Sequence, residues 1–141
     1  MRLVLDTNVV ASAVLWGGMP RLLLQAARDK RVEIFTSTPM LAELTDILGR
    51  RKFAEKIAAS QLTVDQLVDG YAQLAVLVRP VTTPRIAPDP DDDVVVGTAL
   101  AAQAGFIVTG DKPLLSVAEH QGIEVIRVAR AIEVIEAAGK A

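Results

Sequence analysis

The sequence predicts a single domain of the α/β class, built on a mainly parallel sheet. Short apolar runs bounded by polar, Gly or Pro residues are typical of buried strands, and longer segments with helical spacing alternate with them. A length of 141 residues fits one compact domain, residues 1–141. The expected strands are residues 3–5, 32–35, 76–78, 106–109 and 124–128. The expected helices lie near residues 21–28, 39–48, 53–60, 64–74, 94–104 and 131–138.

Composition narrows the possible chemistry. Apolar residues make up 51% and charged residues 23%, which excludes a disordered chain. The absence of cysteine excludes disulfides, thiolate zinc sites and a cysteine nucleophile, and the single histidine, His120, excludes a multi-histidine metal site. We expect His120 to lie in a surface turn. A metal site would therefore have to be built from oxygen ligands.

Charge and hydropathy indicate where the protein acts. The net charge is −2, so any contact with nucleic acid must come from a local patch. The first apolar run, residues 3–5, is too short for a signal peptide, and no run approaches the ~18 apolar residues of a membrane-spanning helix. We expect a cytoplasmic protein without membrane contacts.

Two carboxylates lie just beyond expected strands. Asp6 opens the triplet Asp6-Thr7-Asn8 after the first strand, and Asp111 follows the fourth strand through Thr109-Gly110. Ligands of parallel α/β sheets bind at the carboxyl ends of strands, so both positions suit a functional site. Helix capping by Asp6 and turn formation by Asp111 explain the same residues equally well.

Glu43 lies on the helix expected at residues 39–48, at the margin of its apolar stripe. A carboxylate beside a buried stripe needs a partner or a cation. The alternative is a surface glutamate paired with Arg50 or Lys52.

Four acids, Asp89, Asp91, Asp92 and Asp93, precede the helix expected at residues 94–104. One of them satisfies the helix N-terminus, so four exceed what capping requires. Their repulsion is unfavourable unless they are well hydrated or share a cation. The proline-rich stretch that contains them, residues 79–93, is expected to form an ordered loop beside the active site.

The carboxylates together favour a divalent cation. Oxygen ligands suit Mg²⁺ or Mn²⁺, and such ions activate a water molecule and neutralise charge on a phosphodiester. Either one or two ions would be compatible with four acids.

Four of these segments, taken in their order and spacing, resemble the PIN-domain family, specifically its bacterial and archaeal toxin-like (VapC-like) members. The segments are Asp6-Thr7-Asn8, residues 37–44 with Glu43, Asp89-Pro90-Asp91-Asp92-Asp93 and Thr109-Gly110-Asp111-Lys112. The resemblance spans essentially the whole chain. It implies a three-layer sandwich with a five-stranded parallel sheet of order 3-2-1-4-5. It also implies that the catalytic, metal-binding acids are Asp6, Glu43, Asp93 and Asp111, supported by Thr7, Asn8 and Thr109. Asp91 and Asp92 are supporting residues and the alternatives to Asp93 if the register differs by one.

The activity implied by the resemblance is that of a Mg²⁺- or Mn²⁺-dependent endoribonuclease. Such an enzyme cleaves single-stranded RNA with metal-activated water and leaves a 5′-phosphate and a 3′-hydroxyl. No 2′-hydroxyl acts as nucleophile, so DNA is also a chemically possible substrate. The family further implies a homodimer and the toxin role of a toxin-antitoxin pair, with an antitoxin protein as partner.

Basic residues near these motifs are candidate phosphate contacts: Lys112, Arg50, Arg51 and Lys52, with Lys56 beyond them. Cations at a helix carboxyl end also complement the helix dipole, which is the alternative explanation of the cluster at residues 50–56. Trp16 either stacks on a base or packs against the protein.

A non-catalytic PIN-like module that binds RNA or a partner is the alternative function. The presence of all four acids argues against it. Dinucleotide-binding and P-loop functions are excluded because the chain lacks G-x-G-x-x-G and G-x-x-x-x-G-K-[ST].

Overall fold

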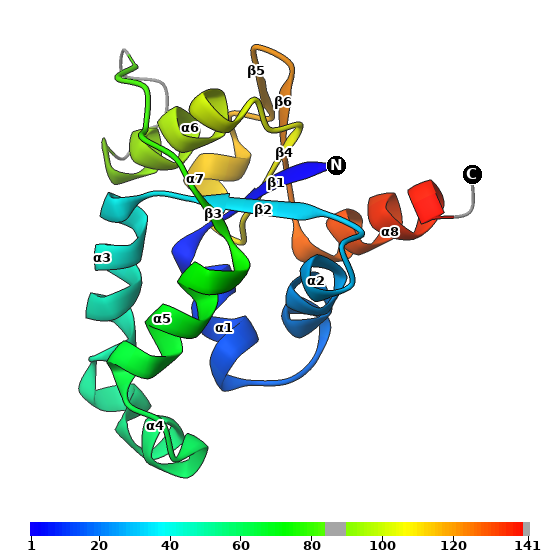
Figure 1. The fold of residues 1–141 in the computed structure, drawn as a ribbon. Helices are drawn as coiled ribbons and strands as arrows, with labels where there is room; N and C mark the ends of the chain where they lie inside the picture. Colours follow the sequence, from blue (N-terminus) through cyan, green and yellow to red (C-terminus); the bar gives the residue numbers. More distant parts are fainter. Residues whose placement is uncertain (84–89, 140–141) are drawn as a thin grey trace.

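A computed structural model describes residues 1–83 and 90–139, with the side chains of residues 90 and 91 excepted. Its helices surround a central sheet (Figure 1). The strands are β1 (Arg2–Leu5), β2 (Glu33–Thr36), β3 (Val76–Leu77), β4 (Phe106–Val108), β5 (Glu119–His120) and β6 (Ile123–Ile126). The helices are α1 (Thr7–Leu15), α2 (Met19–Arg28), α3 (Thr38–Leu48), the 3₁₀ turn η1 (Arg51–Phe53), α4 (Ala54–Ser60), α5 (Val64–Leu74), α6 (Pro90–Ala102), α7 (Lys112–Leu115) and α8 (Val128–Gly139).

The sheet has the order β3-β2-β1-β4-β6-β5. Its first five members are parallel, which confirms the expected 3-2-1-4-5 arrangement of the parallel strands. The sixth strand, β5, pairs antiparallel with β6 and was not predicted. His120 therefore lies in a short strand and not in a turn. The hairpin turn is Gln121-Gly122, whose two positive φ angles, 49° and 84°, are typical of a two-residue hairpin.

Side chains alternate across the strands and divide the core into two layers. Leu3 and Leu5 of β1 join the core beneath α1, α2, α5 and α8, whereas Val4 joins the core beneath α6 and α7. Figure 1 shows helices on both sides of the sheet, which confirms the expected three-layer arrangement. Among the described residues no single helix is long and apolar enough to cross a membrane, although the bent pair α1 and α2 together meets that test by length and composition.

Helix α1 was absent from the expected helices. Its sequence contains β-branched Val9 and Val10, which lower helix propensity. Asp6, which caps the helix, is also a candidate metal ligand, so its presence did not by itself indicate a helix. Packing overrides this weak propensity, because five of its nine residues are buried and the helix packs against α2 and α3.

Helix α6 begins four residues earlier than predicted, at Pro90 and not at residue 94. Asp92 and Asp93 therefore lie inside the first turns of the helix and not in a loop before it, because proline suits the first helical position. Residues 79–83, from the same expected loop, have no regular structure, and residues 84–89, with Asp89, lie outside the described residues. Gly97 of α6 allows a close approach, since a Cβ there would lie 2.3 Å from the Val81 carbonyl oxygen.

Candidate metal-binding edge of the sheet

Asp6 links the end of β1 to the start of α1. Its backbone N–H donates to the Val108 carbonyl at 2.9 Å, which continues the β1–β4 pairing by one residue. Its carboxylate caps α1, because Oδ1 accepts from the Thr7 N–H at 2.8 Å. The capping role considered from the sequence is therefore present. The residue is only 6% exposed, so this carboxylate is held in one orientation.

Thr109 connects Asp6 to Asp111. Its buried hydroxyl donates to Oδ2 of Asp6 at 2.7 Å and accepts from the Asp111 N–H at 3.0 Å. The Asp111 carboxylate in turn accepts from the Leu114 N–H at 3.0 Å and caps α7. One hydroxyl thus orients both strand-end residues, and the structure gives Asp111 a capping role at α7 where the sequence suggested turn formation.

The surroundings of Asp6 disfavour its charged form, which a nearby cation would stabilise. Burial raises the pKa of Asp6, the hydrogen bonds from Thr109 and Thr7 oppose that rise, and the negative charge of Asp111 adds to it. Two carboxylates that repel each other in a partly desolvated place are the arrangement that a divalent ion stabilises.

Glu43 lies on α3 and is half-buried. It lines a cavity of about 530 Å³ together with Pro39, Ala42, Asp46, Arg50 and Val94. The cavity runs along α3 from the level of Pro39 to that of Arg50. Glu43 therefore faces space beside α6 and not the interior of the core.

Asp93 lies on α6, also half-buried, and lines a neighbouring cavity of about 260 Å³. Pro39 and Val94 border both cavities, so Glu43 and Asp93 lie on either side of the same α3–α6 contact. Two hydroxyls fix this contact: Thr98 donates to the Val94 carbonyl at 2.8 Å, and its oxygen is 2.9 Å from the Ser37 hydroxyl, which precedes α3.

The structure places the four acids in two pairs and does not close a ligand set among the described residues. Asp6 and Asp111 form a pair at the strand ends, and Glu43 and Asp93 flank the α3–α6 contact. Among the side chains that the structure describes, no three from His, Cys, Asp or Glu are close enough together to hold an ion. The chemistry of the donors still suits Mg²⁺ or Mn²⁺, because all four are carboxylates.

The supporting residues lie around this edge. Thr7 is buried and Asn8 is exposed at the start of α1, whereas Asp92 is half-buried in α6. Asp91 belongs to α6, and its side chain is not described. The basic residues Lys112, Arg50, Arg51 and Lys52 are all exposed, Lys112 at the start of α7 and the other three after α3.

Arg127 is a basic residue beside the strand-end pair that the sequence did not single out. It was assigned to the last strand, but β6 ends at Ile126, so Arg127 follows the carboxyl end of β6. There it lines a cavity of about 360 Å³ with Asn8, Thr109 and Gly110. The signal that could have identified it is a basic residue directly after a parallel strand, the position that Asp6 occupies after β1.

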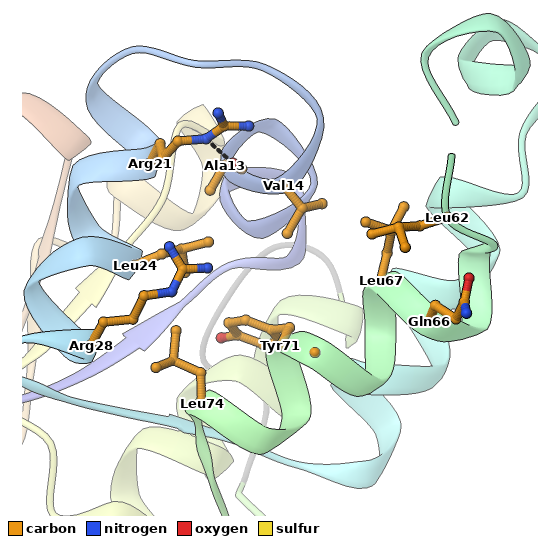
Figure 2. Close-up of a pocket in the computed structure, with 11 residues that line it drawn as sticks. Ala13, Val14, Arg21, Leu24, Arg28, Leu62, Gln66, Leu67, Tyr71 and Leu74 are labelled. Carbon is orange, nitrogen blue, oxygen red and sulfur yellow. Dashed lines mark hydrogen bonds between the residues drawn. The ribbon is translucent and has the colours of Figure 1, made fainter. Parts of the chain in front are cut away.

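A further, separate pocket lies between α1, α2 and α5 (Figure 2). It has a volume of about 360 Å³ and contains Arg21 and Arg28 from α2 and Leu67, Tyr71 and Leu74 from α5. The Tyr71 hydroxyl is buried without a hydrogen-bond partner among the described residues, and burial raises its pKa. No carboxylate lines this pocket, so it is not part of the acidic edge.

Fold and site together define an α/β protein with acidic residues at the carboxyl ends of β1 and β4, where the order of the strands in the sheet reverses. A family model for the PIN domain matches residues 2–113, and the chain belongs to that family. No protein of curated function has a significantly similar sequence. The structure is similar to a chain of the crystal structure of VapBC2 from Rickettsia felis bound to a DNA fragment from their promoter, with a TM-score of 0.61 and 15% identity over 90% of this chain and 98% of that chain.

Proposed function

We propose that the protein is a metal-dependent endoribonuclease that cleaves single-stranded RNA. The observation that carries this proposal is the Asp6–Thr109–Asp111 arrangement at the strand ends of a PIN domain. Glu43 and Asp93, on the two helices beside this edge, supply two further carboxylates.

Asp6, Glu43, Asp93 and Asp111 would hold the ion, with Mg²⁺ or Mn²⁺ as the proposed metal. A bound divalent ion lowers the pKa of a water molecule and neutralises charge developing on the phosphodiester. The chain's own contribution is orientation. Thr109 and Thr7 hold the Asp6 carboxylate, and the Leu114 N–H holds that of Asp111.

Exposed basic side chains on either side of the acids would bind the phosphates. Lys112 directly follows Asp111, and Arg127 lies beyond the neighbouring strand. Arg50 borders the cavity that contains Glu43 and is followed by Arg51 and Lys52. These side chains would bind the RNA backbone as charges without reading sequence.

We further propose that the protein is the toxin of a toxin-antitoxin pair, acting in the cytoplasm as a homodimer that a small antitoxin inhibits. The similarity in fold to a chain of a VapBC complex supports this role. Copurification of the chain with the product of an adjacent small gene, and loss of cleavage in that complex, would test it.

The alternative is a PIN-like module that binds RNA or a partner without cutting. The lack of a closed three-ligand group among the described residues favours it. The two functions separate in one experiment, in which the purified protein is incubated with single-stranded RNA and Mg²⁺ or Mn²⁺. We expect cleavage that stops with EDTA and returns with excess metal, whereas retained binding without cleavage under any metal would support the non-catalytic module.

A further inference from the structure

Two aromatic side chains meet on the surface at the far end of α1. Trp16 follows α1 directly, and Phe53 ends the turn η1. Their ring centroids are 5.5 Å apart with an interplanar angle of 74°, an edge-to-face contact. Phe53 packs against the core, whereas Trp16 is 38% exposed. The core therefore supports an indole ring that solvent can reach.

Two ammonium groups lie over these rings. Lys56 Nζ is 5.5 Å from the Trp16 ring centroid, and Lys52 Nζ is 5.0 Å from the Phe53 centroid. Neither lysine forms an ion pair with another described residue. We call Trp16, Lys52, Phe53 and Lys56 the tryptophan patch. Because lysine side chains are flexible, Lys56 can leave the indole face while its charge stays nearby.

The patch is basic although the chain is acidic. Residues 50–56 contain four basic side chains, Arg50, Arg51, Lys52 and Lys56, against one acidic side chain, Glu55, in a chain of net charge −2. Aromatic rings interleaved with cations are typical of surfaces that bind single-stranded nucleic acid, where bases stack on rings and phosphates meet the charges. An interaction with the helix dipole would explain the basic residues at 50–56, but it would not explain the two aromatic rings beside them.

Helix α1 sets the distance between the patch and the acidic edge. Asp6 caps one end of α1 and Trp16 the other, ten residues later. At about 1.5 Å per residue, the two are about 15 Å apart along the helix axis. At the rise of about 3.4 Å per nucleotide that a strand has in duplex DNA, roughly four nucleotides span this distance. The cavity along α3 also leads from Glu43 to Arg50, which directly precedes η1.

We propose that the tryptophan patch is a second RNA-binding subsite, where a base of the single strand stacks on Trp16 about four nucleotides from the scissile phosphate. Lys52 and Lys56 bind the phosphates beside that base. This subsite rests on the proposed nuclease function and defines its substrate as an unpaired strand, because a base inside a duplex cannot stack on a protein ring.

Binding can be tested directly because Trp16 is the only tryptophan in the chain. Intrinsic fluorescence of the full-length protein is titrated in EDTA with a mixed-sequence 12-nucleotide RNA, and fluorescence anisotropy of labelled RNA is followed in parallel. We expect saturable quenching by the single strand and little by the same sequence as a duplex. RNA binding seen by anisotropy without quenching would overturn the subsite, as would equal quenching by duplex.

Charge and stacking are separated by variants. Lys52→Gln and Lys56→Gln should each reduce the slope of log K against log salt by about one. Trp16→Ala should weaken RNA binding about 5-fold to 100-fold, and Trp16→Phe should keep most of the affinity. The matched control is Met19→Ala, which removes an apolar side chain that is 46% exposed and near Trp16 in sequence. Equal losses in Trp16→Ala and Met19→Ala would contradict stacking.

Substrate length distinguishes this subsite from the nuclease function itself. With metal, Trp16→Ala should raise KM for the 12-nucleotide RNA about 5-fold to 100-fold and leave cleavage of a 3-nucleotide RNA unchanged, since the short strand cannot reach the patch. Cleavage of both lengths unaffected by Trp16→Ala would overturn the subsite while the nuclease function stands. If the wild-type protein cuts no RNA, the nuclease function fails, and the fluorescence titration still decides whether the patch binds RNA.

Discussion

The strand-end acids and the helix-borne acids are held in different ways. Asp6 and Asp111 follow neighbouring strands, so the β1–β4 pairing and a single threonine hydroxyl fix them. Glu43 and Asp93 lie on helices, and their positions depend on how α3 packs against α6. The strand ends therefore form a preset pair, whereas the helix pair depends on tertiary packing. We expect substitutions at the first pair to act mainly on chemistry and those around the second to act mainly through position.

The largest effect is expected from Asp6→Asn. The amide keeps the size of the side chain but removes the charge that a metal requires, so cleavage of RNA should fall by at least about 10²-fold to 10³-fold. Gel-based cleavage assays measure the loss, and circular dichroism checks that folding is intact. Asp46→Asn is the control, because Asp46 is an exposed acid that lines the Glu43 cavity. Comparable activity in Asp6→Asn and wild type would refute the assignment.

Thr109→Val tests the hydroxyl that unites the strand-end pair. Without it, Asp6 loses a donor and the Asp111 N–H loses an acceptor. We expect metal affinity to fall about 10-fold to 100-fold. Thr98→Val is the control on the helix side, since it removes a buried hydroxyl from the α3–α6 contact. Calorimetric titration with Mn²⁺ should show a larger loss of metal affinity for Thr109→Val than for Thr98→Val. The reverse order would show that the helix pair contributes more to metal binding.

Gly97→Ala tests whether α6 needs its close approach to residue 81. The added methyl group would lie 2.3 Å from the Val81 carbonyl oxygen, so the segment or the helix must move, at a cost of about 1–3 kcal/mol in the free energy of unfolding. Gly70→Ala is the control, because nothing lies within 4 Å of its Cβ position and helix propensity favours alanine. Urea unfolding should show Gly97→Ala destabilised and Gly70→Ala unchanged or stabilised.

The smallest effect concerns stability and pH. The pKa of Asp6 is raised in the folded protein, so folding favours its protonated form, and its ionisation reduces stability as pH rises above the unfolded-state pKa. Asp6→Asn should therefore raise the melting temperature in EDTA at neutral pH. The gain should shrink as the pH falls toward 4. A melting temperature that drops at pH 7 would contradict burial as the main cause of the shift.

The sequence predicted the positions of the strand-end acids in the fold better than those of the helix acids. Apolar runs define strands, and parallel strands bring their carboxyl ends to one edge, so local patterns were enough to locate Asp6 and Asp111. Local patterns could not reveal that Ser37 meets Thr98, or that Val81 contacts Gly97, because these contacts join segments far apart in the chain. The start of α6 and the strand β5 were missed for local reasons: Pro90 lies in a proline-rich stretch that was expected to form a loop, and β5 has only two residues.

The meeting of Trp16 with Phe53 shows the same limit. Each aromatic residue by itself suited packing, and only the contact between the end of α1 and η1 makes them one surface. The basic run at residues 50–56 was visible in the sequence, but the ring beneath each lysine was not.

The central claim is that Asp6, Glu43, Asp93 and Asp111 together hold one metal centre. A crystal structure of the wild-type protein soaked in Mn²⁺, with anomalous scattering to locate the ion, tests it most directly. We predict an anomalous peak for an ion that is coordinated by carboxylate oxygens from both the strand-end pair and the helix pair. A protein saturated with Mn²⁺ whose peak contacts neither Asp6 nor Asp111, or which shows no peak at this edge, would contradict the account.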